Sequence, residues 1–323
     1  MGRLTLRVAL AVCLLAALAA CGPVQAGGAP DPEEIARRQI KVVTTIAQIG
    51  DVVKNVAGDR VDLVELMGPG IDPHLYRASE GDVVSLADAD MVFYNGLHLE
   101  AKMADVFEKM QGSVTTVAVT DEINRDELLS PPEFEGAYDP HVWFDVSKWM
   151  SVTEVIRDSF VDLDPQHAEL YEDNARAYLA KLEELDLYVT EQAQLVPEEQ
   201  RVLITAHDAF NYFGDAYDFE VRGLQGISTA AETGTADLSD LADFIVEREI
   251  PAIFIETSVP ERLVEALREA VGARGSEVSI GGSLYSDAMG DAGTPEGTYI
   301  GMVRHNIDTI VAGLTGRSQG EES

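Results

Sequence analysis

From residue 40 onward, short β-branched runs alternate with longer amphipathic stretches, and this alternation is the feature that most constrains the fold. It predicts eight strands in two sets of four, over 40–45, 61–67, 91–94 and 114–119, then over 202–205, 220–224, 252–256 and 277–281. Helical patterns separate the strands, for example over 48–56, 101–110 and 238–248. Strands that alternate with helices at this spacing are typical of βα units, so we expect an α/β protein with parallel-type sheets.

A long helix is predicted between the two sets of strands. Asp164 is a candidate cap, Pro165 suits a first turn, and Pro197 ends the pattern. Its apolar stripe consists of Tyr171, Ala175, Tyr178, Leu182, Leu185 and Val189. About 30 residues at ~1.5 Å each give roughly 45 Å, which is more than one small lobe needs.

We therefore expect two α/β lobes joined by one long rigid helix, with a long surface helix on a single domain as the alternative. The predicted divisions are an N-terminal lobe over 40–163, a connecting helix over 164–197, a C-terminal lobe over 198–316 and a disordered tail over 317–323.

The first twenty residues have the pattern of a signal peptide. A basic start with Arg3 and Arg7 precedes an uncharged apolar run over 8–20, which is too short to cross a bilayer as a helix. Cys21 then follows Leu-Ala-Ala, which resembles the lipobox of bacterial lipoproteins; an ordinary secretory signal is the alternative. We expect an exported protein with lipidated Cys21 and a flexible tether over 21–39, attached to the outer face of the cell membrane through the lipid alone.

Charge and cysteine content limit the chemistry of the body. Asp and Glu number 57 against 23 Lys and Arg, a net charge of −34, which argues against nucleic acid as a partner. The only cysteines are Cys13 and Cys21, so the part of the chain from residue 40 onward has neither a disulfide nor a thiolate ligand. A metal site there would have to be built from His, Asp and Glu.

A repeated pentapeptide carries the clearest chemical signal. Residues 72–76 and 139–143 both read Asp-Pro-His-aliphatic-aromatic, and they contain His74 and His141. Proline restricts its own backbone and that of the residue before it, so each histidine is presented from a stiffened loop. One such histidine would ordinarily be a turn residue. Two copies of the same pattern favour a pair of metal ligands.

Two further candidates follow predicted strands. His207 lies directly after 202–205, where ligands collect at the carboxyl ends of parallel strands, although it could equally be a buried core histidine. Asp287 follows the last strand in a glycine-flanked loop, where a lone aspartate is ordinarily solvated or capping. Three imidazoles and one carboxylate would form a closed site suited to Zn²⁺, and the same donors can hold Mn²⁺.

These motifs carry a resemblance to a family. The stretches 70–100, 139–145, 205–210, 223–229 and 284–294 resemble, in order, the cluster A-I (TroA-like) solute-binding proteins of zinc and manganese ABC importers. The resemblance implies two α/β lobes with a metal site in the cleft between them. It also implies His74, His141, His207 and Asp287 as ligands, and a membrane permease and a separate ATPase as partners.

The sequence limits the identity of the metal less closely than it limits the candidate ligands. In the family, manganese-dedicated members typically have Glu at the third ligand position, where this chain has His207. Zinc-dedicated members often carry a His-rich loop before the second ligand, and 121–137 contains no histidine. These two facts together predict a protein for Zn²⁺, Mn²⁺ or both.

Two alternatives to an importer component come from other classes of protein. A secreted zinc hydrolase would need an open coordination position, which a fourth protein ligand would close. A surface adhesin with a structural metal is the third hypothesis. We expect no enzyme, metal release by movement of Asp287, and affinity that falls below about pH 6.5, because each His ligand must be neutral.

Three secondary predictions concern residues outside the ligand set. Trp143 is expected to shield the site, and one of four carboxylates is expected to accept the second ring N–H of a ligand histidine. Those carboxylates are Asp139, Asp145, Asp208 and Glu256. The remaining histidines, which are expected to be structural or exposed, are His98, His167 and His305.

Overall fold

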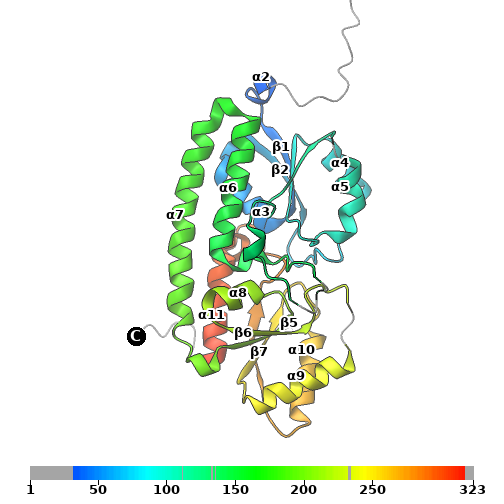
Figure 1. Cartoon of the computed structure of the whole chain (residues 1–323), viewed down its shortest axis with the longest axis vertical. Helices are drawn as coiled ribbons and strands as arrows, with labels where there is room; N and C mark the ends of the chain where they lie inside the picture. The colour runs from blue at the N-terminus through cyan, green and yellow to red at the C-terminus, as the bar shows by residue number, and fades with distance from the viewer. Residues whose placement is uncertain (1–31, 111, 132–133, 135, 232–233, 317–323) are drawn as a thin grey trace, which may run out of the picture.

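The computed structural model describes residues 32–316 except 111, 132–133, 135 and 232–233. The predictions of a signal peptide over 1–20, lipidation of Cys21, most of the tether over 21–39 and a tail over 317–323 therefore lie outside the described residues. Figure 1 shows two lobes stacked along the long axis of the molecule, with one helix running beside both.

The N-terminal lobe is built on a parallel four-stranded sheet in the order β2-β1-β3-β4. Its strands are β1 (Ile40–Ile46), β2 (Val61–Met67), β3 (Met91–Tyr94) and β4 (Thr115–Ala118). β1 is central and almost continuously apolar, and all its residues except Lys41 are buried, as expected for a parallel strand covered on both faces. The helices of this lobe are α2 (Pro32–Ile35), α3 (Ala47–Ala57), α4 (Glu80–Ala87), α5 (Ala104–Met110) and α6 (Val146–Leu163).

The C-terminal lobe contains two parallel strand pairs, β5 with β6 and β7 with β8, and β5 lies beside β7. The strands are β5 (Val202–His207), β6 (Glu220–Gln225), β7 (Ala252–Glu256) and β8 (Ser279–Leu284). The helices are α8 (Asn211–Tyr217), α9 (Thr235–Glu247), α10 (Arg262–Gly272) and α11 (Tyr299–Thr315). A separate apolar core fills this lobe between the strands, α9 and α10.

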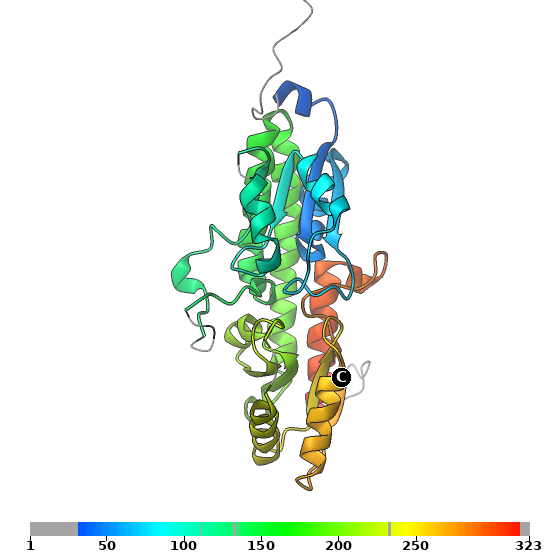
Figure 2. The same cartoon turned by 90° about the vertical axis from the view of Figure 1, so that its right-hand side faces the viewer.

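The long helix is α7 (Ala168–Ala193), and both views show it running beside the two lobes with α11 next to it (Figures 1 and 2). The whole predicted apolar stripe is buried. Tyrosine hydroxyls add polar ties, because Tyr178 donates to Asp51 of α3 and Tyr188 donates to Asp308 of α11. α7 is therefore fixed to elements of both lobes by packing and by hydrogen bonds.

Asp164 differs from its predicted role as a helix cap. A 3₁₀ turn over Pro165–His167 precedes α7, and the carboxylate caps no backbone N–H there. It accepts instead from the Arg60 guanidinium at 2.8 Å, the Tyr171 hydroxyl at 2.7 Å and Nδ1 of His167 at 2.9 Å. This network fastens the start of the long helix to the N-terminal lobe.

The α/β class, the parallel sheets and the long helix are confirmed, and all eight predicted strands are present. The largest displacement is in β8, which continues past the glycine pair where the prediction ended it. A Cβ on Gly281 would lie 2.6 Å from the Phe254 ring, and one on Gly282 would lie 2.4 Å from the Thr309 methyl. The glycines let β7 and α11 approach the strand rather than ending it.

Within the described residues, no helix combines the length and the apolar character needed to cross a membrane.

Candidate metal centre

The four predicted ligand residues meet where the two lobes face each other. His207 is the last residue of β5, and Asp287 follows β8 by three residues. His74 lies in the loop after β2, and His141 immediately precedes the 3₁₀ turn Val142–Phe144. Two carboxyl strand ends and two Asp-Pro-His loops thus converge on one point, as parallel α/β sheets favour.

The donor atoms of this cluster are spaced as ligands of one small ion would be. One ligand atom from each residue lies within 4.8 Å of all the others. His74 Nε2 and His141 Nε2 are 3.2 Å apart, and the Asp287 carboxylate lies 3.3 Å from His207 Nε2 and 3.4 Å from His141 Nε2. Ligands about 2.0–2.1 Å from a tetrahedral ion are separated by roughly 3.3 Å. The His74 Nε2 to Asp287 distance, 3.9 Å, is the longest of the four.

The cluster is closed to solvent and polar groups within it lack partners. His141 and His207 are fully buried, Asp287 is 1% exposed and His74 is 4% exposed. Nε2 of His207 and both carboxylate oxygens of Asp287 make no hydrogen bond within the described residues. Buried polar atoms are nearly always partnered, so an inward-facing set of this kind fits a bound cation.

Carboxylates orient two of the three imidazoles. Asp139 Oδ1 accepts from Nδ1 of His141 at 2.7 Å, and Glu256 Oε2 accepts from Nδ1 of His207 at 2.5 Å. In both rings this leaves Nε2 as the atom that faces the cluster and that could bind a metal once it is deprotonated. Asp139 and Glu256 are thus the partners among the four carboxylates considered, whereas Asp145 caps α6 through Ser147 N and Lys148 N.

The carboxylates also set the protonation of the cluster. Burial lowers the pKa of His74 to about 3; it outweighs the opposite effect of the Asp287 carboxylate, and the neighbouring imidazoles add to the lowering. Burial acts the same way on His141 and His207, but the carboxylates beside them prevail. Asp139 and Asp287 raise the pKa of His141 to about 9, and Glu256 and Asp287 raise that of His207 well above its ordinary value. The histidines in turn hold the pKa of Asp287 well below its ordinary value despite burial. A metal ion bound by these residues would therefore have to displace protons.

The two Asp-Pro-His loops share a local geometry. Asp72 Oδ1 accepts from His74 N at 2.8 Å, and Asp139 Oδ1 accepts from His141 N at 2.9 Å. The second oxygen of Asp72 accepts from the Thr229 hydroxyl at 2.6 Å, which joins this loop to the opposite lobe. The sequence reasoning missed the roles of Asp72 and Thr229. The repeat held the signal for Asp72, since it stands where Asp139 stands.

An aromatic wall closes the cluster beside His141, as predicted for Trp143. The centres of the Trp143 and His141 rings are 5.2 Å apart, and Trp143 is fully buried. Its indole N–H donates to the Ser286 carbonyl at 3.1 Å, one residue before Asp287. Trp143 therefore covers one side of His141 and holds the backbone beside Asp287.

The other histidines lie outside the cluster, as expected. His98 is exposed on its loop, His167 is paired with Asp164, and Nε2 of His305 is 3.0 Å from the Ser283 carbonyl.

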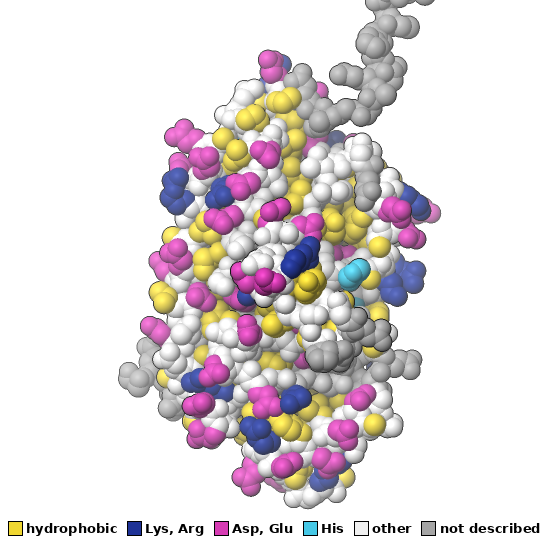
Figure 3. Space-filling view, in the orientation of Figure 1, with side chains coloured by type: hydrophobic (Ala, Val, Ile, Leu, Met, Phe, Trp, Pro, Cys, Tyr) yellow, Lys and Arg dark blue, Asp and Glu magenta, His cyan; other side chains and the backbone are white. Residues whose placement is uncertain are grey.

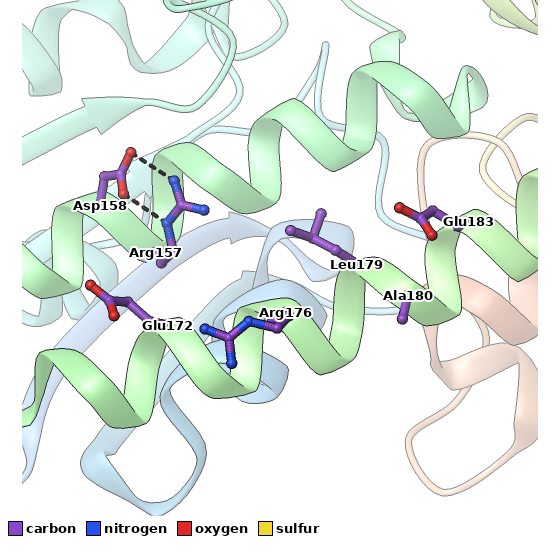
Figure 4. Close-up of a pocket in the computed structure, with 7 residues that line it drawn as sticks. All are labelled: Arg157, Asp158, Glu172, Arg176, Leu179, Ala180 and Glu183. Atoms are coloured by element: carbon purple, nitrogen blue, oxygen red, sulfur yellow. Dashed lines mark hydrogen bonds and ion pairs between the residues drawn. The ribbon is translucent and has the colours of Figure 1, made fainter.

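A second concave feature lies on the helical surface, in a groove of 590 Å³ between α6 and α7 (Figure 4). Its two arginines pair with carboxylates of their own helices, since Arg157 bonds to the adjacent Asp158 and Arg176 pairs with Asp173. The groove does not have the convergent unpartnered donors of the cluster between the lobes.

Fold and cluster together are those of a two-lobed protein with a closed candidate metal site of three histidines and one aspartate. The chain belongs to the family described as zinc-uptake complex component A, periplasmic, which matches residues 42–313.

Two curated relatives are similar over nearly their full lengths. The chain is 52% identical to zinc-binding protein TroA of Treponema pallidum over 309 residues, covering 96% of this chain and 99% of TroA. It is 45% identical to manganese-binding lipoprotein MntA of Bacillus subtilis over 299 residues, covering 92% of this chain and 95% of MntA.

A solved structure of the periplasmic zinc-binding protein TroA from Treponema pallidum has the same fold. It superposes with a TM-score of 0.84 at 55% identity, covering 85% of this chain and 99% of that one. The family is one of metal-uptake components and not of enzymes, and none of these relatives supports a hydrolase or an adhesin.

Proposed function

We propose that this protein is the extracytoplasmic metal-binding component of an ABC importer, which captures Zn²⁺, Mn²⁺ or both and delivers the ion to a membrane permease. The observation that carries the proposal is the convergence of His74, His141, His207 and Asp287, whose ligand atoms all lie within 4.8 Å of one another. The family and the printed metals of TroA and MntA support the same function.

The four residues would serve as the complete ligand set for the transported ion. Three nitrogens and one oxygen at near-tetrahedral spacing favour Zn²⁺, because Mn²⁺ prefers more oxygen donors. Burial and the fourth protein donor leave no open coordination position for a metal-bound water, which is why the arrangement favours capture over hydrolysis.

The chain must act with other proteins to move an ion across a membrane. We propose a permease and a separate ATPase as its partners. We also propose export by the signal peptide over 1–20, anchoring through lipidated Cys21 and a tether over 21–39. MntA is itself named a lipoprotein, which supports the anchor. Acidic side chains spread over the face in Figure 3 with basic ones among them, a surface suited to solvent rather than to nucleic acid.

The division into lobes over 40–163 and 198–316 with a connecting helix over 164–197 belongs to the same proposal. The bounds of α7 and the placement of β1–β4 and β5–β8 in different lobes support it. In this arrangement each lobe supplies two ligands, so that relative movement of the lobes would couple to capture and release.

The test is competitive metal binding by a soluble form beginning at residue 40, stripped of metal and titrated in parallel with Zn²⁺ and Mn²⁺. We expect one tightly bound ion per chain and at least a hundredfold weaker binding by Asp287→Ala, since loss of a ligand is more damaging than the 10–100-fold loss typical of an outer partner. Arg157→Ala, in the groove of Figure 4, is the control and should bind as the wild type does. Absence of stoichiometric binding of both ions would overturn the proposal.

A further inference from the structure

The two sides of the metal cluster are joined across the lobes very differently. The segment around His141 carries several hydrogen bonds to the C-terminal half of the chain. Asp139 accepts from Asn211 Nδ2 at 3.0 Å through its carboxylate and from the Tyr212 hydroxyl at 3.0 Å through its carbonyl. Trp143 donates to the Ser286 carbonyl and accepts from the Tyr299 hydroxyl at 2.7 Å through its own carbonyl. The segment that carries His141 is therefore hydrogen-bonded to residues that follow β5 and to residues that follow β8.

The Asp287 loop is equally fastened. Ser286 pairs with the Ser258 hydroxyl at 2.9 Å, and Asn306 of α11 bonds both the N–H and the carbonyl of Tyr285. Residues on both sides of Asp287 are buried. The glycine-flanked sequence predicted a mobile Asp287, but these contacts hold its loop in place, so Asp287 is not the ligand that the structure leaves easiest to move.

The loop over 68–79, which carries His74, is held much more lightly. Within the part of the chain that the structure describes, the one hydrogen bond seen between this loop and the opposite lobe is that from Thr229 to Asp72. Ile71 and Leu75 on the same loop are 40% and 51% exposed. His74 is the most exposed of the four ligand residues and has the longest contact to Asp287.

We propose that Asp72 and Thr229 form a latch that holds His74 in its ligating position, and that the ion enters and leaves on this side of the site. This inference rests on the proposed function. The latch is well placed because one carboxylate makes both contacts: Asp72 Oδ1 fixes His74 through its backbone N–H, while Oδ2 engages Thr229. Loss of the Thr229 bond would free the loop while the His141 and Asp287 contacts stay in place.

The experiment compares metal dissociation rates of full-length wild-type protein with those of Thr229→Val and Thr229→Ser, measured by rapid mixing of the zinc-loaded protein with excess chelator. Loss of a hydrogen bond to a charged group changes the equilibrium constant of the state it stabilises by about a factor of ten or more. Because the Thr229 bond stabilises the closed loop, Thr229→Val should release zinc about tenfold faster. Thr229→Ser keeps the hydroxyl and should stay within about twofold of the wild type.

Thr257→Val is the matched control, because Thr257 is exposed on the same lobe near Gly70 of the loop, and its side chain makes no hydrogen bond seen within the described residues. Hydrogen exchange of the zinc-loaded protein supplies a second readout. Residues 68–79 should lose protection in Thr229→Val, whereas 139–145 should not, a pattern that general destabilisation would not give.

Unchanged dissociation by Thr229→Val, or equally fast release by Thr229→Ser, would overturn the latch while leaving the importer function intact. Failure of the wild-type protein to bind zinc or manganese would overturn both. If Thr229→Val does not fold, Thr229→Ala removes the same hydroxyl with less bulk and carries the same expectation.

Discussion

Glu256 and Asp139 each accept from a ligand histidine, but they do so in different ways, and the difference predicts unequal effects of removing their charges. Each oxygen of Glu256 has its own donor, since Oε1 accepts from His207 N at 2.8 Å and Oε2 accepts from His207 Nδ1. A single oxygen of Asp139 accepts both from His141 N and from His141 Nδ1, while the other accepts from Asn211 Nδ2.

Glu256→Gln replaces one of its two acceptor oxygens with an NH₂ group. The amide oxygen is expected to accept from the His207 backbone N–H, which is a donor only, so the NH₂ then faces Nδ1. Nδ1 must become an acceptor, so the one proton that the neutral ring keeps lies on Nε2, the atom that faces the other ligands. Before His207 can bind an ion, this buried arrangement has to be broken.

Loss of an outer partner that fixes the tautomer of a ligand histidine costs 10–100-fold in metal affinity, about 1.4–2.7 kcal/mol. Because Glu256 is buried and water cannot replace the lost acceptor, we expect Glu256→Gln to lie near the upper end of that range. Asp139→Asn should cost only about threefold, since its amide oxygen can still accept from both donors of His141 and Asn211 can rotate its own amide.

The assay is zinc affinity by competition with a chelator of known strength at pH 7.5, together with urea unfolding of each metal-free variant. The two substitutions remove the same charge beside the same cluster, so each is the other's electrostatic control. Equal losses of affinity would mean that charge alone sets binding, and the tautomer argument would be wrong. Wild-type affinity in Glu256→Gln would refute it more directly.

Two further predictions concern protons and the long helix. The pKa of His141 is raised to about 9 and that of His207 is raised as well, so zinc affinity should increase with pH up to about 9 rather than levelling off above pH 6.5. The expected increase is roughly tenfold per pH unit for each proton displaced. A zinc affinity that does not change between pH 6.5 and 8.5 would contradict this. Asp164→Asn should lower the free energy of unfolding at pH 7 by about 2 kcal/mol, since the substitution weakens three charge-assisted bonds to a buried carboxylate. Although burial opposes it, hydrogen bonds hold the pKa of Asp164 below its unfolded value, so the contribution is present above about pH 4 and fades as the pH falls through the folded pKa. The control is Asp173→Asn in the exposed pair with Arg176 on the same helix, which should change stability by less than about 0.5 kcal/mol.

The strands and the long helix could be predicted because each depends on a local pattern. β1 and β5 are buried throughout or nearly so, which gives short apolar β-branched runs, and the stripe of α7 repeats at helical spacing. The end of β8 could not be placed because the role of Gly281 and Gly282 depends on Phe254 and Thr309, residues of other elements. A glycine pair ends a strand in one tertiary setting and permits close packing in another.

The sequence predicts the four residues that the structure brings into one cluster, but it did not identify the residues that hold them in place. His207 and Glu256 are 49 residues apart, and Asp72 and Thr229 are 157 apart. Partners of this kind are chosen by how the lobes pack, and no local pattern distinguishes Glu256 from the other candidate carboxylates. Asp287 illustrates the same point, since its neighbouring glycines predict a mobile loop, whereas contacts with Ser258 and Asn306, which the local sequence does not show, fasten the residues before it.

The two Asp-Pro-His copies show how one local motif can hold one histidine firmly and another lightly. In both, the aspartate bonds the backbone N–H of its histidine, so both loops present an imidazole in the same way. Asp139 also binds the imidazole itself and faces Asn211 across the lobes, which makes His141 the rigid half of the pair. Asp72 leaves its imidazole without a carboxylate and places its second oxygen on Thr229. A site in which every histidine had its own buried carboxylate would bind protons and metal more tightly at every ligand, yet a transport protein also has to give up its ion. In the proposed latch, one histidine lies on a loop with a single hydrogen bond to the opposite lobe among the described residues, which would allow release without loosening the other three ligands.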